Sequence, residues 1–240
     1  MLSIIPAPKG FLQKIRAVQR TFLWSGNLEK RKWSLIAWNK LCKPKHLGGL
    51  NLQDPSMINR AYGAKLWWKW LKEPNLPWAK HWKEKYAPKY SSQNLIRMQE
   101  NPEGSPIWNL ARNNRKIIQE HSFWEIRDGK TALFWEDARQ QLPKLERPEF
   151  ADCKRNNQEL GRTIVNHYWK PNERDRGWRT WIFNEIEDIT KEYNSMRNLR
   201  TQLDKRRIQT TRDRDRLRWA KLEGGKFMLR EARTHLENLE

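Results

Sequence analysis

Three residues in the second half of the chain have the types and order that metal-dependent nuclease chemistry uses. Asp152 and Lys154 form an Asp-x-Lys arrangement, and Asp137 lies upstream. Carboxylates placed in this way can hold a divalent ion that activates water. No strand pattern flanks them, and the surrounding stretch is polar and bounded by prolines. A nuclease therefore stays open as an alternative, and it would require these three side chains to converge on one point.

Other chemical signatures are absent from the sequence. It has no Asp-Asp pair of the kind that two-metal polymerases use, no Walker phosphate-binding loop and no His-Glu-x-x-His zinc pattern. Cys42 and His46 have a ligand-like spacing, but Cys153 and His167 lie far along the chain without forming a tight pair. We therefore expect no catalytic residues, no bound metal and no cofactor.

The composition is strongly basic and rich in tryptophan. The 240 residues carry 48 Lys and Arg against 28 Asp and Glu, a net charge of +20, and include 15 Trp. A charge of this size favours polyanionic partners such as RNA or DNA. No apolar run is long enough to span a membrane, the first residues lack a signal-peptide pattern, and two cysteines fit a reducing compartment. We therefore expect an intracellular protein, nuclear or cytoplasmic, without membrane contact.

Sequence-independent binding to a nucleic-acid backbone requires Lys and Arg side chains along a surface, because the binding is driven by release of counterions from phosphates. The first 120 residues hold 22 Lys and Arg against seven Asp and Glu, so they are the better candidate for this surface. The cationic candidates are Lys9, Lys14, Arg16, Arg20, Lys30, Arg31, Lys32, Lys43, Lys45, Lys65, Lys69, Lys72 and Lys80. The alternative for each is an ordinary solvated side chain.

Tryptophan and lysine alternate in the segment LWWKWLK at 66–72, as in proteins that stack bases on aromatic rings. On a helix, however, its tryptophans fall on one broad apolar face and its lysines cluster opposite. We therefore interpret these tryptophans as core and these lysines as the surface that meets phosphates. Trp78 and Trp82, in a proline-bounded stretch with further lysines, are the better candidates for base stacking.

Periodic spacing of apolar residues predicts a mainly α-helical fold. Helices are expected over about 10–24, from the Asp54-Pro55 start to about 72, from the Ser105-Pro106 start to about 120, over about 178–203 and from about 230 onward. Residues 30–40 suggest a short helix or strand, and 74–88 a turn-rich stretch. Two small β-hairpins are expected, at about 123–135 and 217–229, around Asp-Gly and Gly-Gly turns. The predicted organisation is a basic, tryptophan-rich helical region at 1–140, a linker at 141–161, and a helical region with a C-terminal hairpin at 162–240.

Short segments spread along the chain form an ordered pattern. They are FLWSG at 22–26, Trp38, CKPK at 42–45, GGL at 48–50, Asn59, KLWWKW at 65–70, KY at 85–86, Trp108, WEIRDGK at 124–130, FWED at 134–137, DRLRW at 215–219 and GKF at 225–227. In this order they resemble the region that follows the polymerase palm in reverse transcriptases of plant non-LTR (LINE-type) retrotransposons. Arg139 and Asn51 depart from that pattern, since the family commonly has Trp and Gly there.

The resemblance implies a helical, thumb-like connector that packs against a reverse transcriptase palm and helps to hold RNA and DNA. The family's catalytic Ala-Asp-Asp motif would lie before Met1 and its zinc-binding module after Glu240, so the resemblance implies that this chain does not polymerise by itself. The leading prediction is a non-catalytic, nucleic-acid-binding C-terminal fragment of a reverse transcriptase. Two alternatives stay open: a scaffold that docks a polymerase palm, and a functionless retroelement remnant.

Overall fold

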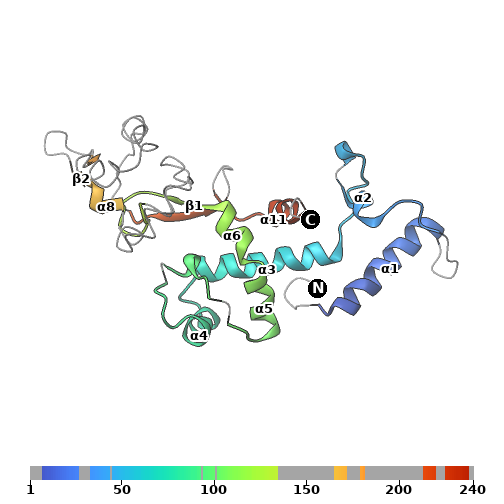
Figure 1. Ribbon diagram of the computed structural model, residues 1–240, viewed down its shortest axis with the longest axis horizontal. Helices are drawn as coiled ribbons and strands as arrows, with labels where there is room; N and C mark the ends of the chain where they lie inside the picture. Colours follow the sequence, from blue (N-terminus) through green and yellow to red (C-terminus); the bar gives the residue numbers. More distant parts are fainter. Residues whose placement is uncertain are drawn as a thin grey trace, which may run out of the picture. The chain divides into compact units, whose positions relative to one another are not determined.

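The computed structural model describes residues 7–26, 33–43, 45–92, 94–100, 102–134, 165–171, 179–181, 213–219 and 225–237. These residues are mainly helical, which confirms the predicted fold class, and they include two separate two-stranded sheets (Figure 1). The chain forms two compact units, one of residues 1–120 with 227–240 and one of residues 121–226. Both ends of the chain therefore contribute to the first unit.

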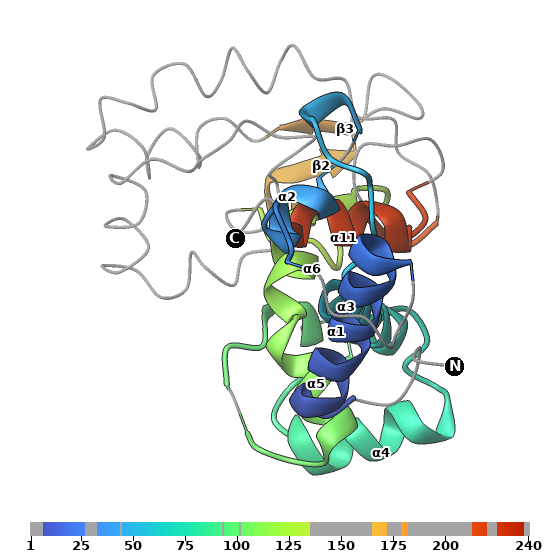
Figure 2. The ribbon, with the colours of Figure 1, turned by 90° about the vertical axis from the view of Figure 1, so that its right-hand side faces the viewer.

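The first unit is built around one helix. Its elements are α1 (Lys9–Ser25), α2 (Trp38–Cys42), the 3-10 turn η1 (Lys45–Leu47), α3 (Pro55–Lys72), α4 (Pro77–Tyr86), the 3-10 turn η2 (Leu95–Arg97), α5 (Pro106–Asn113), α6 (Arg115–His121) and α11 (Leu229–Glu237). Helix α3 is the centre, because α1, α5 and α11 all pack on it (Figures 1 and 2). Gly63 permits the approach of α5, since a Cβ there would lie 2.6 Å from the Leu110 carbonyl oxygen.

The helices begin where local signals place them. The Asp54 carboxylate accepts a hydrogen bond from the Ser56 amide at 2.7 Å and so caps α3, with Pro55 at the first helical position. The Ser105 hydroxyl accepts from the Trp108 amide at 3.3 Å and caps α5 in the same way. Gly26 ends α1 with a positive φ of 65°, a backbone conformation that glycine adopts without strain. The predicted starts and ends of α1, α3 and α5 are therefore confirmed to within a residue or two, apart from the end of the helix that starts at Pro106.

Tryptophan rings form the core between α3, α4 and α5. Trp67, Trp70 and Trp108 are fully buried, and Trp68 is nearly so, which confirms the interpretation of the α3 tryptophans as core. Trp70 and Trp108 meet edge to face with ring centroids 5.3 Å apart, and Tyr86 stacks on Trp108 at 4.2 Å. Such pairs each add about 0.5–1.5 kcal/mol beyond the area they bury. This core fixes the rotation of α3 about its axis.

Two predictions for the first unit are wrong in detail. The stretch expected to be turn-rich contains helix α4, because Pro77 stands at a first helical position and Trp82 packs into the tryptophan core. The helix expected from 106 to 120 is two helices, α5 and α6, separated at Asn114, whose side-chain amide donates to the Leu110 carbonyl at 2.8 Å. Residues 30–40 contribute the start of α2 at Trp38.

The second unit contains the strands. Strand β1 (Ser122–Glu125) pairs antiparallel with β4 (Arg216–Trp219), and β2 (Trp169–Pro171) pairs antiparallel with β3 (Arg179–Trp181). Helix α8 (Val165–Tyr168) precedes β2 directly. The prediction of two local hairpins is therefore wrong in its pairing. A strand lies at the start of each predicted hairpin, but these two strands, β1 and β4, pair with each other. The reason is the loop that follows β1, which bonds to Asp215 instead of turning back as a hairpin.

Other expectations for the second half lie partly outside the described residues. The helix expected at 178–203 is contradicted at its start, where β3 lies, and its remainder is outside the described residues. The linker predicted at 141–161 is also outside them and stays a prediction. The final helix is confirmed as α11, but it packs on α3 and so belongs to the first unit.

Candidate nucleic-acid interface

The face of α3 opposite its tryptophans carries three exposed lysines. Lys65, Lys69 and Lys72 follow one another at i, i+4 and i+7, so they form one row along the helix. Lys65 lies over the Tyr62 ring and Lys72 over the Trp68 ring, each with its ammonium 5.8 Å from the ring centroid. These contacts leave the charges in water while the aliphatic stems cover aromatic surface. The row is therefore positioned by the buried core, and we call it the α3 lysine row.

One ion pair of the lysine row lies along its own helix. Glu73 lies 3.9 Å from the Lys69 ammonium, and both side chains are about half exposed. A pair of this kind on a helix surface contributes about 0.3–0.5 kcal/mol and is easily displaced by a phosphate. Lys80, on α4, is also exposed.

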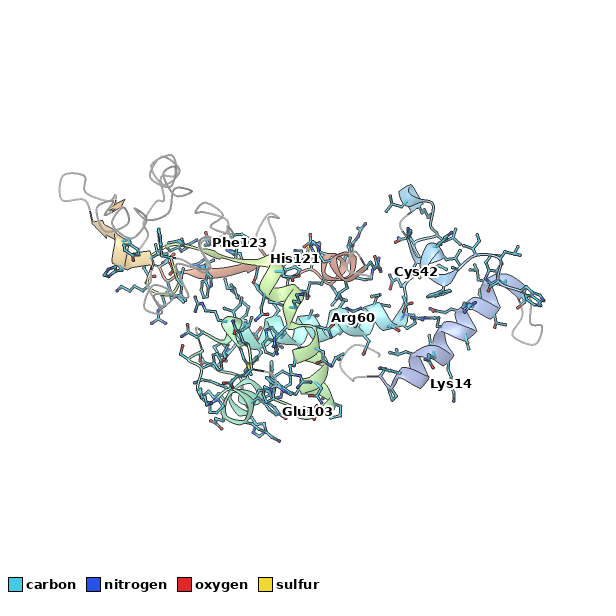
Figure 3. All side chains as sticks on the ribbon, in the orientation of Figure 1. Lys14, Cys42, Arg60, Glu103, His121 and Phe123 are labelled. Atoms are coloured by element: carbon cyan, nitrogen blue, oxygen red, sulfur yellow. The ribbon has the colours of Figure 1, made fainter. Side chains whose placement is uncertain are left out.

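The other cationic candidates, apart from Arg16, are spread over the first 45 residues. Lys9 and Lys14 are exposed on α1, and Lys43 and Lys45 are exposed around η1 (Lys14 is labelled in Figure 3). Arg20 donates to the Ser34 hydroxyl at 2.8 Å. Residues 30–32, which include Lys30, Arg31 and Lys32, lie outside the described residues.

Arg16, one of the predicted backbone-binding cations, is paired with a carboxylate of its own unit. Its guanidinium lies 2.7 Å from the Asp54 carboxylate, which also accepts the Trp38 indole N–H at 2.8 Å and caps α3. Burial alone would raise the pKa of Asp54, but the hydrogen bonds from Arg16 and the Ser56 amide hold that pKa below its usual value. The Arg16–Asp54 pair therefore joins α1 to α3, and Trp38 of α2 bonds to the same carboxylate. No local pattern around Arg16 indicates this contact, because its partner lies 38 residues away.

The predicted stacking site on α4 is also corrected by the structure. Trp82 is 8% exposed and meets Trp70 and Trp108 edge to face, so its ring has no face available to a base. Trp78 is half-buried, with its ring centroid 5.1 Å from that of Trp82. The strongly exposed aromatic rings lie elsewhere: Trp33 is 91% and Phe22 is 68% exposed.

No metal site is found in the part of the chain that the structure describes. Those residues contain no group of three or more His, Cys, Asp or Glu side chains that could hold an ion. Burial and the neighbouring Asp54 raise the pKa of the Cys42 thiol to about 11, so it is protonated at neutral pH, not a ready thiolate ligand (Figure 3). The nuclease alternative is not addressed, since Asp137, Asp152 and Lys154 lie outside the described residues. None of the helices described is both long and apolar enough to cross a membrane.

A second polar site, in the second unit, was missed by sequence reasoning. The buried Asp215 carboxylate accepts four backbone N–H groups: Oδ1 from Arg127 and Gly129 at 2.7 and 2.9 Å, and Oδ2 from Thr131 and Ala132 at 2.9 and 3.0 Å. Gly129 has a φ of 68°, which lets the loop curl around the carboxylate. We call residues 127–132 the clamped loop. Asp215 and the loop come from two of the segments that carry the family resemblance.

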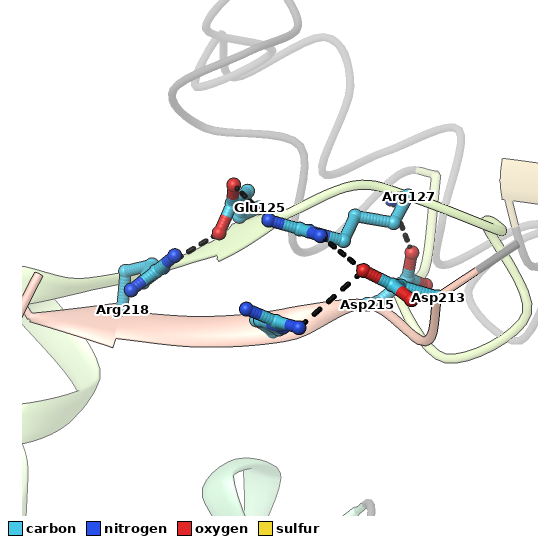
Figure 4. Close-up of polar contacts among 6 residues, drawn as sticks. Glu125, Arg127, Asp213, Asp215 and Arg218 are labelled. Atoms are coloured by element: carbon cyan, nitrogen blue, oxygen red, sulfur yellow. Dashed lines mark hydrogen bonds and ion pairs between the residues drawn. The ribbon is translucent and has the colours of Figure 1, made fainter. Parts of the chain in front are cut away.

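Carboxylates also pair with the arginines around this loop (Figure 4). Glu125 bridges Arg218 at 2.6 Å and Arg127 at 3.0 Å, and Asp213 lies 2.6 Å from Arg127 and 3.4 Å from Arg216. Burial would raise the pKa of Glu125, but the two arginines lower it. Each of these three arginines is therefore already paired with a carboxylate of its own unit.

The chain has relatives in plants. It is 29% identical over 242 residues to the Arabidopsis thaliana protein named "Putative ribonuclease H protein", and the match covers 96% of this chain and 35% of that protein. It is 28% identical over 137 residues to the Arabidopsis thaliana "Uncharacterized mitochondrial protein", covering 57% of this chain and 87% of that protein. The chain thus spans about a third of the length of the first relative. No protein-family model and no solved structure matches it.

Proposed function

We propose that this chain is a non-catalytic, nucleic-acid-binding part of a plant retroelement protein related to reverse transcriptases. The α3 lysine row carries the proposal. The row is regularly spaced, exposed and held in place by the tryptophan core. The net charge of +20 would supply the general attraction to RNA or DNA. The ordered sequence segments and the ribonuclease H name of one relative support the retroelement origin.

The proposal is tested by fluorescence anisotropy of labelled single-stranded RNA and duplex DNA against the full chain at several salt concentrations. We expect binding at about 50 mM salt that weakens steeply as salt rises. Replacing Lys65, Lys69 and Lys72 with Ala should lower the affinity roughly tenfold or more and reduce the slope of log affinity against log salt by about 2–3.

A charge-matched variant controls for the general loss of positive charge. Lys116, Lys226 and Arg230 are exposed and lie outside the row, so their replacement by Ala removes the same charge. This variant should bind within about threefold of the wild type. Equal weakening by both triple variants would mean that diffuse charge, not the row, holds the nucleic acid. No binding at about 50 mM salt by a folded chain would overturn the proposal altogether.

A nuclease is the second candidate function, because one relative is named a ribonuclease H protein. The absence of any Asp-Asp pair favours the non-catalytic alternative for polymerisation. The chain should neither extend a primer on an RNA template nor cut the RNA strand of an RNA–DNA hybrid in the presence of Mg²⁺. Cleavage that disappears in Asp152→Asn would contradict the non-catalytic proposal and assign the chemistry to the Asp152 and Lys154 region.

A further inference from the structure

Trp33 is the most exposed of the large apolar side chains that the structure describes, at 91%. This exposure is unusual, because tryptophan is a large apolar side chain that is highly buried on average. Trp38, five residues further on, shows the contrast: it is 8% exposed and donates its indole N–H to the Asp54 carboxylate. The Trp33 ring therefore adds little to the core of its own unit, and its faces are open to another molecule.

A hydrogen bond holds the segment that carries this ring. The Arg20 guanidinium, on α1, donates to the Ser34 hydroxyl at 2.8 Å. Ser34 directly follows Trp33, so the ring is kept beside α1 although its segment forms neither helix nor strand. A side chain on a segment held in this way loses less conformational freedom on binding than one on a freely moving loop.

The same hydrogen bond places a positive charge next to the ring. Its acceptor is a neutral hydroxyl, so the exposed Arg20 guanidinium keeps its charge, and it has five N–H donors in all. The wider stretch has the same sign, because residues 1–53 contain ten Lys and Arg against one acidic residue, Glu29. An exposed aromatic ring beside exposed cations is the arrangement that binds single-stranded nucleic acid, since a base stacks on the ring while the cations meet the phosphates.

We propose that Trp33 is a stacking site for an unpaired base of single-stranded RNA or DNA, with Arg20 beside it to meet a neighbouring phosphate. This inference rests on the proposed function, because it takes the α3 lysine row to hold the nucleic-acid backbone. It adds a preference that the row does not supply. Lysines attract the phosphates of single strands and duplexes alike, whereas the Trp33 ring stacks only on a base that no duplex encloses.

Other occupants fit the ring less well. An apolar pocket of a partner protein would have to remove water from the Arg20 guanidinium next to the ring, at a cost in free energy. Segments that bind a membrane surface are typically helices with a broad apolar face, and Trp33 lies outside the helices. A nucleic-acid strand offers both a flat base for the ring and a negative charge for the arginine.

The test measures the affinity of the full chain, by fluorescence anisotropy, for a labelled unstructured single-stranded RNA and for a duplex of the same sequence. We expect Trp33→Ala to weaken binding of the single strand about fivefold or more, and binding of the duplex less than about twofold. Trp33→Phe keeps a ring and should bind the single strand within about threefold of the wild type. The matched control is Leu35→Ala, which removes an apolar side chain that is 84% exposed but has no ring, and it should bind within about twofold of the wild type.

A DNA strand with abasic sites in place of its bases tests the stacking itself. It keeps the phosphates, so the wild type and Trp33→Ala should bind it with equal affinity, although they differ on a strand of the same length with bases. The slope of log affinity against log salt should also be equal for these two proteins, because Trp33→Ala removes no phosphate contact. The triple variant of the α3 lysine row should instead lower that slope, which separates the two sites.

Several results would overturn the stacking site. Unchanged single-strand affinity in Trp33→Ala, with normal binding by the wild type, would do so and leave the proposed function intact. Equal weakening by Leu35→Ala, or a difference on the abasic strand as large as on the strand with bases, would reduce the effect to general apolar contact. No binding of either nucleic acid by the folded wild type would refute the proposed function and the stacking site with it. Binding to vesicles of phosphatidylserine and phosphatidylcholine that Trp33→Ala abolishes, without any loss of single-strand affinity, would assign the ring to a membrane surface.

Discussion

The Asp54 carboxylate joins three helices of the first unit. It binds Arg16 of α1, Trp38 of α2 and the Ser56 amide of α3. Because its folded-state pKa is lowered, its charge stabilises the fold above the unfolded-state pKa of about 4, and this contribution is lost as the pH falls below that value. Asp54→Asn should therefore reduce the free energy of unfolding at pH 7 by about 1–3 kcal/mol, and by less at pH 3.

Urea unfolding at both pH values, followed by tryptophan fluorescence, measures this difference. Glu73→Gln is the control, because it also replaces a carboxylate with an amide but removes an exposed pair with Lys69 worth about 0.5 kcal/mol or less. A loss in Asp54→Asn that is the same at pH 7 and pH 3 would show that the charge of Asp54 is not what stabilises the junction.

Asp215 holds the clamped loop from within the second unit. An Asn in its place has one acceptor oxygen, so at most one pair of the four backbone N–H groups keeps its partner. Asp215→Asn should destabilise the loop by about 2–4 kcal/mol and speed amide exchange at Gly129 and Thr131. Asp213→Asn, which makes the same chemical change two residues away at an exposed carboxylate, should leave the exchange of these amides nearly unchanged. Equal effects of the two variants would contradict the clamp.

At the scale of the elements, the contact of α3 with α5 depends on Gly63. A Cβ at this position would lie 2.6 Å from the Leu110 carbonyl oxygen and 2.9 Å from the Asn114 amide nitrogen. Gly63→Ala should therefore lower the free energy of unfolding by about 1–3 kcal/mol, although alanine is the better helix former. Gly10→Ala, in α1, meets nothing within 4 Å and should raise it by up to about 1 kcal/mol. Thermal unfolding of both variants compares the signs, and a stabilising Gly63→Ala would mean that α5 can move away.

The same elements show which parts of the fold can be predicted from the sequence. Helices α3 and α5 are predictable because the signals that begin them, Asp54-Pro55 and Ser105-Pro106, act within three residues. The pairing of β1 with β4 is not, since the partners lie about 90 residues apart and each is beside a turn that favours a local hairpin. Strand signals therefore placed both strands but not their partners.

In the candidate site, too, some residues can be predicted from local spacing and others depend on contacts with distant parts of the chain. The lysine row follows from the helical spacing of Lys65, Lys69 and Lys72 alone, and its prediction as an exposed face is confirmed. The roles of Arg16 and Trp82 depend on partners in other helices, so the spacing of their own neighbours could not distinguish a structural side chain from a ligand-binding one. The role of such a residue is determined by its tertiary contacts.

At the scale of the whole molecule, segments from both halves of the chain contribute to each compact unit. Strand β1 pairs with β4, which lies far along the chain. Helix α11 packs on α3, and next to it Phe227 stacks near Trp68 with ring centroids 6.2 Å apart. A chain cut between 141 and 161 would therefore leave two fragments that share both units. We therefore expect the two fragments to stay associated through the β1–β4 and α3–α11 contacts after such a cut.

A protease site inserted in 141–161 tests this. After cleavage, the two fragments should separate on a denaturing gel but elute together in size-exclusion chromatography at physiological salt, because burial of the β1–β4 and α3–α11 contacts opposes their dissociation. Removing 227–240 from the cleaved chain deletes α11 and should weaken this association, since the α3–α11 contact is lost while the β1–β4 pairing and the bonds of Asp215 to the clamped loop remain. Separate elution of the cleaved, full-length chain would instead favour two independent bodies divided at the predicted linker, and would contradict the shared first unit.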